Sequence, residues 1–452
     1  MDKTLSALTD FVTTTTFDDL PERVVERAAG IVVDTLGCLV GGRDYLAVGE
    51  ATALTTDEVR ALEWGVAVGM PGNYPPELAA FLNTTMIRCL DFNDHLVAGH
   101  ASDMIGALFA VANRPGRPSS GADLLTALVV AYEVHARVVK IQWMNQSIDR
   151  TWSIAIGATA GVCNLLGLSA AATRNALAMA ATASVGLRAA RAGALSDFKA
   201  TASSVSSKSG VFYALLAEAG LTGPEAPFEG RHGARELFEG EPGPIEFEPF
   251  GSAWKTLLTC NKYWPVAYGI QPAIWTAIEL RDIVPIDQVE KVVLHAAPFG
   301  WHESGHERER WDPSTRESAD HSMPYAFARA YETGGVDGDA FVPSAFRNPD
   351  TLAFMQRITV EPDWDRGPKI SDIVGTRAEL TTKSGELHVV NVDDPIGHHS
   401  NPMTREQINA KARKLIQPVL GDRTEAALEA AWAVASAPNL DAVFAAFTPR
   451  IP

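Results

Sequence analysis

The feature that most constrains this fold is a helical hydrophobic pattern that fills the first half of the chain, stops, and returns near the end. The segment from Asp18 to Val40 is a clear example: Pro21 lies in its first turn, its apolar residues form one stripe, and it stops at Gly41-Gly42. Similar stripes run over residues 122–140, 152–166, 169–185 and 206–220. Helical sequence resumes at Thr404, which has the spacing of a capping box with Gln407, and continues through the Ala-rich stretch 425–447.

Between these helical parts the sequence favours β-structure. One predicted helix, residues 271–280, is followed by strand-like segments at residues 289–296, 357–361 and 378–392. Within the last segment, Lys383-Ser384-Gly385 predicts a hairpin turn. We therefore predict a mainly α protein with an α+β lid. Its large helical domain is built from both chain ends, residues 1–268 and 401–452, and its smaller α/β domain spans residues 269–400.

Composition excludes several classes of protein. The net charge of −17 argues against a nucleic-acid partner, because phosphate binding requires a basic face. No apolar run approaches the roughly 18 residues that a membrane helix needs. The first residues, Met1 to Thr4, lack the basic and apolar regions of a secretory signal, which predicts a cytoplasmic protein. An anionic substrate would require cations gathered locally against the overall negative field.

The cysteines predict neither a zinc site nor an iron–sulfur cluster. All four lie far apart in the sequence, without a Cys-x-x-Cys pair: Cys38, Cys89, Cys163 and Cys260. We interpret them as reduced core residues.

The densest polar cluster in an apolar setting is Asp91-Phe92-Asn93-Asp94-His95, followed by His100-Ala101-Ser102-Asp103. If the helix that starts at Pro76 continues this far, Asp91 and Asp94 share one face, and His100 folds back towards them. Carboxylates that orient a histidine form an acid–base unit. Two alternatives stay open: the Asp residues cap helix ends beside a turn histidine, or the group binds a metal, although its spacing matches no specific metal motif.

Two further groups of residues are candidates for ligand binding. The stretch from Ser184 to Ser209 is rich in small residues and carries four cations, Arg188, Arg191, Lys199 and Lys208. Cations in such a stretch suit carboxylate binding, although a solvated helix face has the same pattern. Lys262-Tyr263-Trp264-Pro265, with Tyr268 and Gln271, lies where the helical pattern gives way to the α/β part. Two interpretations of this second group stay open: it lines a ligand pocket at a domain junction, or its aromatic residues simply pack together.

Together these segments resemble the MmgE/PrpD family over nearly the whole chain. The matching segments are residues 17–21, 34–37, 76–81, 90–94, 187–199, 209–212, 220–224, 228–230, 319–325 and 397–404. Their order and spacing carry the resemblance, since no single motif is decisive. The family includes 2-methylcitrate dehydratase, cis-aconitate decarboxylase and iminodisuccinate epimerase, and residues 187–230 are closest to the dehydratase branch.

The resemblance implies a homodimer with an active site between the helical domain and the lid, and no metal or organic cofactor. The implied chemistry is proton removal or return at a carbon of a small carboxylic acid. The matching catalytic positions are Asp91, Asp94, His100, Lys199 and Lys262. In this assignment His100 moves the proton, while the lysines and Arg191 bind carboxylates and offset charge on an enolate-like intermediate. Further substrate-binding candidates are Arg150, Arg188, Arg191, Tyr268, Gln271 and Tyr325.

The chain departs from the dehydratase branch at several polar positions. That branch has an Asp-His pair where this chain has Asp149-Arg150, and Glu and His where it has Ala267 and Gly269. Other members have a histidine near Gln271. The leading prediction is therefore a dehydratase of a hydroxy polycarboxylate other than 2-methylcitrate. A decarboxylase or epimerase acting on a related acid, and a carboxylate-binding protein that has lost catalysis, are the alternatives.

Overall fold

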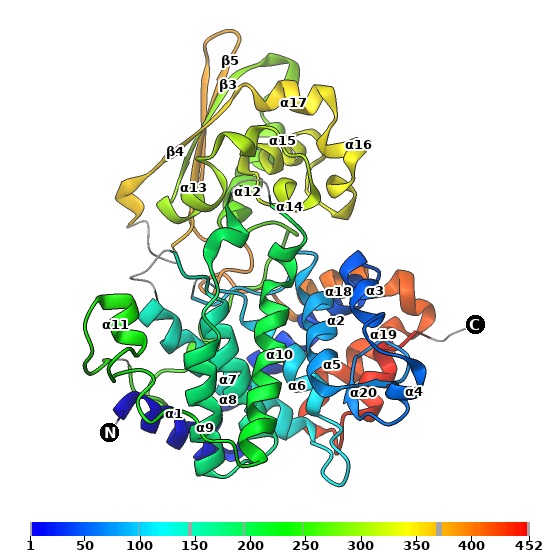
Figure 1. The fold of residues 1–452 in the computed structure, drawn as a ribbon. Helices are drawn as coiled ribbons and strands as arrows, with labels where there is room; N and C mark the ends of the chain where they lie inside the picture. The colour runs from blue at the N-terminus through cyan, green and yellow to red at the C-terminus, as the bar shows by residue number, and fades with distance from the viewer. Residues whose placement is uncertain are drawn as a thin grey trace. The chain divides into compact units, whose positions relative to one another are not determined.

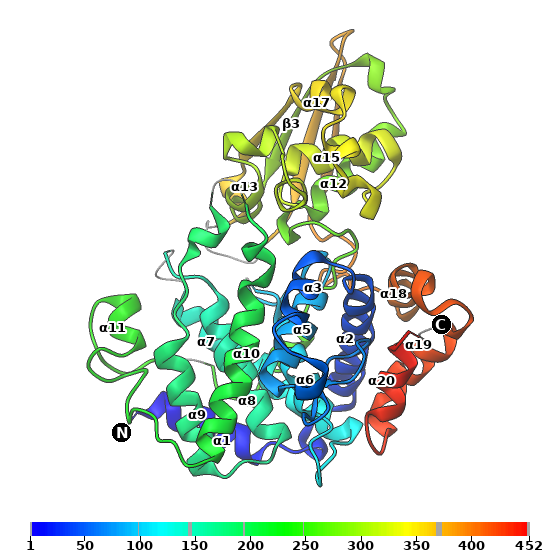
Figure 2. The same ribbon diagram turned by 45° about the vertical axis from the view of Figure 1, so that its right-hand side comes forward.

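The computed structural model describes residues 2–97, 99–142, 147–192, 195–246, 248–367 and 373–449. The chain forms two compact units (Figures 1 and 2). The first comprises Met1–Ala189, Ala200–Thr259 and Thr404–Pro452, and the second comprises Ala190–Lys199 and Cys260–Met403. The first unit is helical and contains both chain ends, and the second contains the larger sheet. The predicted fold class, mainly α with a smaller α/β part, is confirmed.

The helices of the first unit follow the hydrophobic stripes of the sequence. Up to residue 259 they are α1 (Lys3–Thr14), α2 (Glu22–Gly41), α3 (Leu46–Thr52), α4 (Asp57–Arg60), α5 (Pro76–Arg88), α6 (Ile105–Val111), α7 (Gly121–Gln142), α8 (Thr151–Leu165), α9 (Ala170–Ala183), α10 (Phe198–Glu218) and α11 (Ala234–Glu239), and the first two residues of α10 are grouped with the second unit. After residue 403 they are α18 (Arg405–Leu420), α19 (Thr424–Trp432) and α20 (Asp441–Phe447). A short antiparallel pair, β1 (Gly65–Val66) and β2 (Asn73–Tyr74), precedes α5. No helix in these described parts is both long and apolar enough to cross a membrane.

Two details differ from the sequence prediction. Helix α10 begins at Phe198, eight residues before the predicted stripe. The predicted helix over residues 425–447 is divided into α19 and α20, with a 3-10 turn at Val434–Ser436 between them. The predicted capping box at the start of α18 is confirmed, since Gln407 N donates to Thr404 Oγ1 and Thr404 N donates to Gln407 Oε1.

Small residues allow the central helices of the first unit to pack closely. Helix α8 lies against α7, and Gly161 of α8 faces the backbone of α7. A Cβ atom at Gly161 would lie 2.9 Å from the carbonyl oxygen of Ala127, closer than side chains approach. An alanine there would push the two helices apart, which explains the glycine at this position of α8.

A buried ion pair joins the returning helix α18 to the first part of the chain. Lys411 Nζ lies 2.7 Å from Asp34 Oδ1 of α2, and both side chains are almost fully buried. The same ammonium group donates to the carbonyl oxygen of Phe92 at 2.7 Å and lies 4.1 Å from the centre of the Phe92 ring. Lys411 therefore ties α18 both to α2 and to the loop that follows α5.

The second unit is built on a four-stranded sheet of order β4-β3-β5-β6. Its strands are β3 (Val289–Ala296), β4 (Ile358–Pro362), β5 (Thr376–Thr382) and β6 (Leu387–Val392). Strand β3 pairs parallel with β4 and antiparallel with β5, and β5 and β6 form the predicted hairpin. Its helices are α12 (Gln271–Arg281), α13 (Pro298–Ser304), α14 (Arg316–Ala319), α15 (Met323–Thr333), α16 (Pro343–Phe346) and α17 (Pro349–Met355).

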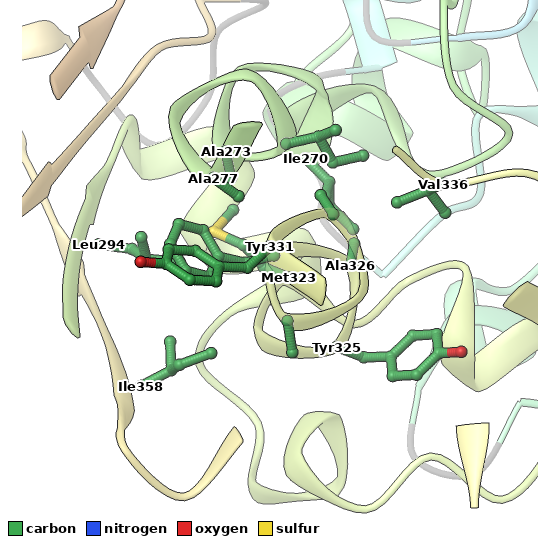
Figure 3. Packing of buried hydrophobic residues seen from close by; sticks show 14 of the residues in the cluster. Ile270, Ala273, Ala277, Leu294, Met323, Tyr325, Ala326, Tyr331, Val336 and Ile358 are labelled. Carbon is green, nitrogen blue, oxygen red and sulfur yellow. The ribbon is translucent and has the colours of Figure 1, made fainter. Parts of the chain in front are cut away.

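The core of the second unit lies between the sheet and two of these helices. Helix α12 packs against β5 and β6, and α15 packs against α12 and β4. Figure 3 shows the packing, in which Leu294 and Ile358 from neighbouring strands lie close to Met323 and Tyr331 of α15. The alternating burial along β5 is that of a sheet covered on one face.

Replacing Lys411 with methionine should destabilise the helical unit. The change keeps the length of the side chain but leaves the buried Asp34 carboxylate without its ammonium partner. We expect the free energy of unfolding to fall by about 3 to 5 kcal/mol, as when one member of a buried pair is removed. Chemical denaturation followed by circular dichroism measures this effect. The control is Lys414→Met on the exposed side of the same helix. Equal stability of the two variants would show that the ion pair is dispensable.

Candidate active-site residues

The loop after α5 begins with a residue in an unusual backbone conformation. Asp91 has a φ of +49°, in the left-handed region, and its N–H donates to the carbonyl oxygen of Arg88 at 3.0 Å. A residue in this conformation commonly ends a helix. Glycine is the usual residue there, because a side chain is sterically disfavoured in the left-handed region. Helix α5 therefore stops at Arg88, and the shared helical face expected for Asp91 and Asp94 is not formed.

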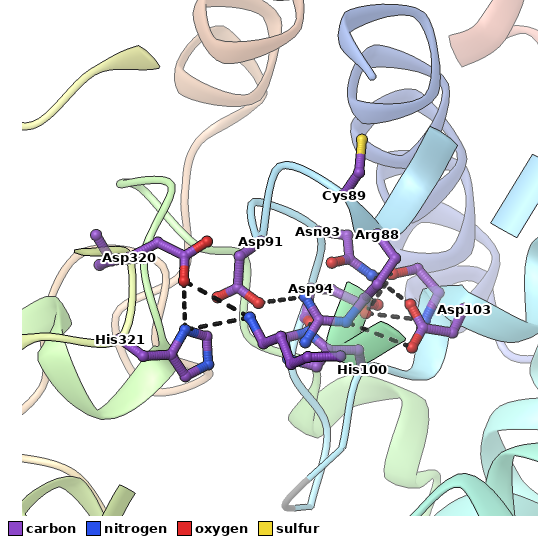
Figure 4. Close-up of polar contacts among 12 residues, drawn as sticks. Arg88, Cys89, Asp91, Asn93, Asp94, His100, Asp103, Asp320 and His321 are labelled. Carbon is purple, nitrogen blue, oxygen red and sulfur yellow. Dashed lines mark hydrogen bonds and ion pairs between the residues drawn. The ribbon is translucent and has the colours of Figure 1, made fainter. Parts of the chain in front are cut away.

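A buried arginine holds two carboxylates beside this loop. Arg88 forms an ion pair with Asp91, and its Nε lies 3.7 Å from Asp103 Oδ2, with all three side chains about 1% exposed. Asn93 Nδ2 donates to Asp103 Oδ1 at 2.9 Å (Figure 4). Arg88 was not among the predicted site residues. Its only sequence signal is its position three residues before Asp91 at the end of a helix.

Burial raises the pKa of Asp103 to about 6, although the nearby Arg88 guanidinium lowers it. The proton is bound more tightly here than in water because the charged carboxylate is deprived of solvent. Asp103 is therefore largely ionised at neutral pH, where Arg88 balances its charge, and becomes protonated in mildly acidic solution.

Asp94 organises the rest of the loop. Its Oδ1 accepts hydrogen bonds from the backbone N–H and the hydroxyl group of Ser102, at 2.9 and 2.6 Å. Its Oδ2 accepts from the hydroxyl group of Tyr132 on α7, at 2.6 Å. Burial raises the pKa of Asp94, and the hydrogen bonds from Ser102 and Tyr132 partly oppose this shift. Ser102 lay in the predicted polar cluster but was given no role, and Tyr132 was absent from the predicted site, because a contact between α7 and this loop leaves no spacing signal.

His100 is held by the backbone of Asp94. Its Nδ1 lies 2.7 Å from the carbonyl oxygen of Asp94. A carbonyl oxygen only accepts hydrogen bonds, so Nδ1 must carry the proton. In the neutral ring the lone pair then lies on Nε2. His100 is half-buried, and its ring lies edge-on to that of His95, with 6.0 Å between the ring centres.

The second unit contains its own group of charged residues. Lys199, in the first turn of α10, contacts the side chains of both Asp320 and His321. Its Nζ is 3.6 Å from Asp320 Oδ1 and 3.2 Å from His321 Nδ1. His321 Nδ1 also contacts Asp320 Oδ1 directly (Figure 4). Lys199 was predicted. Asp320 and His321 were not, although an adjacent Asp-His pair between two helices was a signal that could have found them.

Lys262 is fully buried in the second unit. A buried ammonium group requires close partners of opposite polarity. The loop that carries Lys262 is fixed on both sides: Asn261 N donates to the carbonyl oxygen of Gly397 at 2.9 Å, and Tyr263 N and Trp264 N donate to Gln271 Oε1. Gln271 Nε2 donates to the carbonyl oxygen of Trp264 at 2.9 Å. The side chain of Gln271 therefore holds the backbone of the loop that carries Lys262.

Two predicted substrate-binding aromatic residues lie in the interior of the second unit. Tyr325 is fully buried in the core shown in Figure 3, and its hydroxyl group donates to the carbonyl oxygen of Ala340. Tyr268 is buried beside Cys260, Phe299 and Val374. Packing and a backbone hydrogen bond account for the position of Tyr325.

The predicted arginines lie on two segments that pair in the first unit, and on the segment that follows. Arg150 directly precedes α8 and lies near an antiparallel bridge between Ile148 and Leu187. Arg188 N donates to the carbonyl oxygen of Ser147 at 2.9 Å, which brings the segments of Arg150 and Arg188 together. Arg191 ends the same 3-10 turn as Arg188 and is grouped with the second unit.

The four cysteines are buried free thiols, as predicted. Burial raises the pKa of Cys163 to about 12, so this thiol stays protonated and unreactive at neutral pH. Within the described ranges, no three His, Cys, Asp or Glu side chains are arranged to hold a metal ion.

Comparison with known proteins identifies a single family. The model of the MmgE/PrpD N-terminal domain matches residues 6–245, and that of the C-terminal domain matches residues 264–434. The cis-aconitate decarboxylase-like protein oryM of Aspergillus oryzae is 27% identical over 91% of this chain and 90% of its own length. Human cis-aconitate decarboxylase is 24% identical, over 87% and 84% of the two chains. The 2-methylcitrate dehydratase of Cupriavidus necator is 25% identical, over 88% and 86%.

The raised pKa of Asp103 predicts a pH-dependent contribution to stability. The pKa is about 6 in the folded chain, against 3.8 for an ordinary Asp, so the folded state binds this proton more tightly. The contribution is complete below about pH 4 and is lost as the pH rises through about 6, a change of roughly 2 to 3 kcal/mol. The wild type should therefore lose stability relative to Asp103→Asn between about pH 4 and pH 8. Denaturant titrations across this range measure the difference. Asp10→Asn, at an exposed position, is the control. A stability difference between wild type and Asp103→Asn that does not change with pH would contradict the raised pKa of Asp103.

Proposed function

Because this chain belongs to the MmgE/PrpD family, we propose that it is a lyase that moves a proton at a carbon next to a carboxylate in a small di- or tricarboxylic acid. We also propose that it works without a metal or organic cofactor. Its relatives include enzymes named 2-methylcitrate dehydratase and cis-aconitate decarboxylase, whose named substrates are tricarboxylates. The observation that carries the proposal is the hydrogen bond between His100 Nδ1 and the carbonyl oxygen of Asp94.

This hydrogen bond prepares His100 to act as a base. It fixes the tautomer whose Nε2 holds the lone pair, so the ring can accept a proton from carbon without first rearranging. The Asp94 side chain is itself fixed, because Ser102 and Tyr132 donate hydrogen bonds to its carboxylate. The whole loop is anchored by Lys411 at Phe92. His100 is thus a half-buried histidine on a rigid support.

Lys199 and Lys262 supply positive charge for the substrate. Both are almost fully buried in a protein with a net charge of −17. Buried cations bind carboxylates strongly because little water competes for them, and they stabilise negative charge that develops on an enolate-like intermediate. Arg150, Arg188 and Arg191 are proposed to add further carboxylate contacts, as is usual for the bidentate arginine side chain.

The leading reaction is dehydration of a hydroxy polycarboxylate. His100 Nε2 takes the proton from the carbon next to a carboxylate, and the C–H electron pair forms the double bond. The C–O bond at the adjacent carbon breaks, and its electron pair leaves with oxygen, which gains a proton and departs as water. The product is an unsaturated acid. Both electron pairs are accounted for and only water is released, so that no oxidant or reductant is consumed.

A decarboxylase is the second candidate. The space around Gly269 supports this alternative, because it does not admit a side chain of the dehydratase pattern. A Cβ atom at Gly269 would lie 2.6 Å from the Cα atom of Gly300, so no side chain fits where the dehydratase branch has a histidine. Ala267 is buried and offers only its backbone N–H, which donates to the carbonyl oxygen of Asp320. The Glu and His side chains of the dehydratase pattern are therefore absent at positions 267 and 269, and no other polar side chain takes their place at these two positions.

Replacing His100 with asparagine should lower kcat by about a hundredfold or more, because a general base is removed. The melting temperature should change little. The matched control is His232→Asn, since the side chain of His232 is 74% exposed and asparagine tolerates its left-handed backbone. Steady-state rates with a panel of citrate-like and succinate-like acids measure the effect. Equal rates for His100→Asn and wild type would place the base elsewhere.

2-Methylcitrate is expected not to be the preferred substrate. Each substrate group that loses its polar partner costs about 1 to 3 kcal/mol, which favours a smaller or differently shaped acid. Comparing kcat/KM for 2-methylcitrate, citrate, cis-aconitate and shorter dicarboxylates tests this. Gly269→His cannot serve as a reversal, because the backbone of Gly300 occupies the space. If 2-methylcitrate has the highest kcat/KM of these acids, the prediction is wrong and the protein is an ordinary 2-methylcitrate dehydratase.

A further inference from the structure

We propose that His321 is a second proton-transfer residue of this enzyme, an acid whose tautomer is set by Asp320. The inference rests on the proposed lyase function and adds to it a residue to which the sequence analysis gave no role. It is carried by the arrangement of Lys199, Asp320 and His321 in the second unit.

The contacts of His321 Nδ1 determine where its proton lies. This nitrogen contacts Asp320 Oδ1 and lies 3.2 Å from Lys199 Nζ. A carboxylate only accepts hydrogen bonds and an ammonium group only donates them. Without its proton, Nδ1 would direct a lone pair at the Asp320 carboxylate at close range, which is repulsive. The proton therefore lies on Nδ1 and is donated to Asp320, which leaves Nε2 as the nitrogen that gains and loses a proton.

Asp320 is well placed to support a positive charge on His321. Its carboxylate is 1% exposed and the His321 side chain is 15% exposed. The buried carboxylate favours the imidazolium form and holds the ring in one orientation. The Lys199 ammonium group, 3.2 Å from His321 Nδ1, opposes this positive charge, so that the charge depends on Asp320. Lys199 Nζ, 3.6 Å from the same carboxylate, fixes Asp320 in turn. The result is a histidine that can be protonated at Nε2 and oriented at Nδ1.

Helix capping does not explain these two side chains. The start of α15 is capped by Ser322, whose side chain accepts from Tyr325 N. The start of α14 is capped by Thr315, whose side chain accepts from Ser318 N. Asp320 ends α14 through its backbone N–H, and its carbonyl oxygen accepts from Ala267 N. The backbone of Asp320 therefore forms hydrogen bonds that maintain the fold, whereas its carboxylate contacts Lys199 and His321.

The proposed chemistry requires such an acid. In the dehydration, the His321 imidazolium donates its Nε2 proton to the oxygen of the leaving hydroxyl group. The C–O bond breaks with its electron pair on that oxygen, water departs, and His321 is left neutral. The base of the reaction meanwhile holds the proton taken from carbon. Release of that proton to solvent and uptake of one by His321 restore both residues. In a decarboxylation, the His321 proton would instead go to the carbon that retains the C–C electron pair when carbon dioxide leaves.

The test compares His321→Ala, His321→Asn and Asp320→Asn with the wild type and with the control His232→Asn. We expect kcat to fall about a hundredfold or more for both His321 variants, with folding verified by circular dichroism. Added imidazole should restore part of the rate of His321→Ala, which no purely structural role explains. Asp320→Asn should move the alkaline limb of the kcat profile to lower pH, because the imidazolium loses its carboxylate.

The outcomes separate this inference from the proposed function. A normal rate for the His321 variants, with a low rate for His100→Asn, would overturn the role of His321 and leave the lyase function intact. A low rate of His321→Ala without imidazole rescue, together with an unchanged pH profile of Asp320→Asn, would reduce the group to a structural one. If the wild type acts on none of the acids tested, the proposed function is wrong and the inference falls with it.

Discussion

The buried contact between Lys411 and Asp34 is the constraint on which the helical unit depends. The two residues are far apart in the sequence, and their pairing closes a unit that the second unit interrupts. The cost of burying an ammonium group is offset by three partners, the carboxylate of Asp34, the carbonyl oxygen of Phe92 and the Phe92 ring. Since Phe92 follows Asp91, the ion pair that closes the unit also fixes the loop that carries the proposed base.

That loop combines backbone strain with buried charge. A left-handed conformation at a residue such as Asp91 costs on the order of 1 to 2 kcal/mol, and it persists only where the surroundings enforce it. Here Arg88 enforces it by binding the Asp91 carboxylate, while Asp103 and Asn93 hold the neighbouring turn. The result is a set of carboxylates that keep fixed positions beside His100. Rigid placement of charged groups is what proton transfer at carbon requires, because the transition state must be stabilised without rearrangement.

The sequence predicts the elements of this protein better than the contacts that make its site. Helical periodicity, the Thr404 capping box and the strand at residues 289–296 are local properties, and the structure confirms them. Tyr132 and Arg88 were missed because their roles arise only when α7 and α5 meet the loop. Asp91 and Asp94 were expected on one helical face, but the left-handed residue ends the helix first. Gln271 and Tyr325 were assigned to the substrate, yet the structure shows their polar groups bonded to the backbone. These hydrogen bonds do not test a role in substrate binding, and the assignments of all the predicted site residues, Gln271 and Tyr325 included, stay predictions.

The central claim is that this protein moves protons at a carbon next to a carboxylate. The most direct measurement is to incubate the purified protein in deuterated water with citrate-like and succinate-like acids and to follow the carbon-bound protons by NMR. The account predicts that deuterium appears at the carbon next to a carboxylate in substrate or product, with the wild type and not with His100→Asn. Binding of an acid without any exchange or turnover would contradict the account and identify a carboxylate-binding protein that has kept the fold and lost the chemistry.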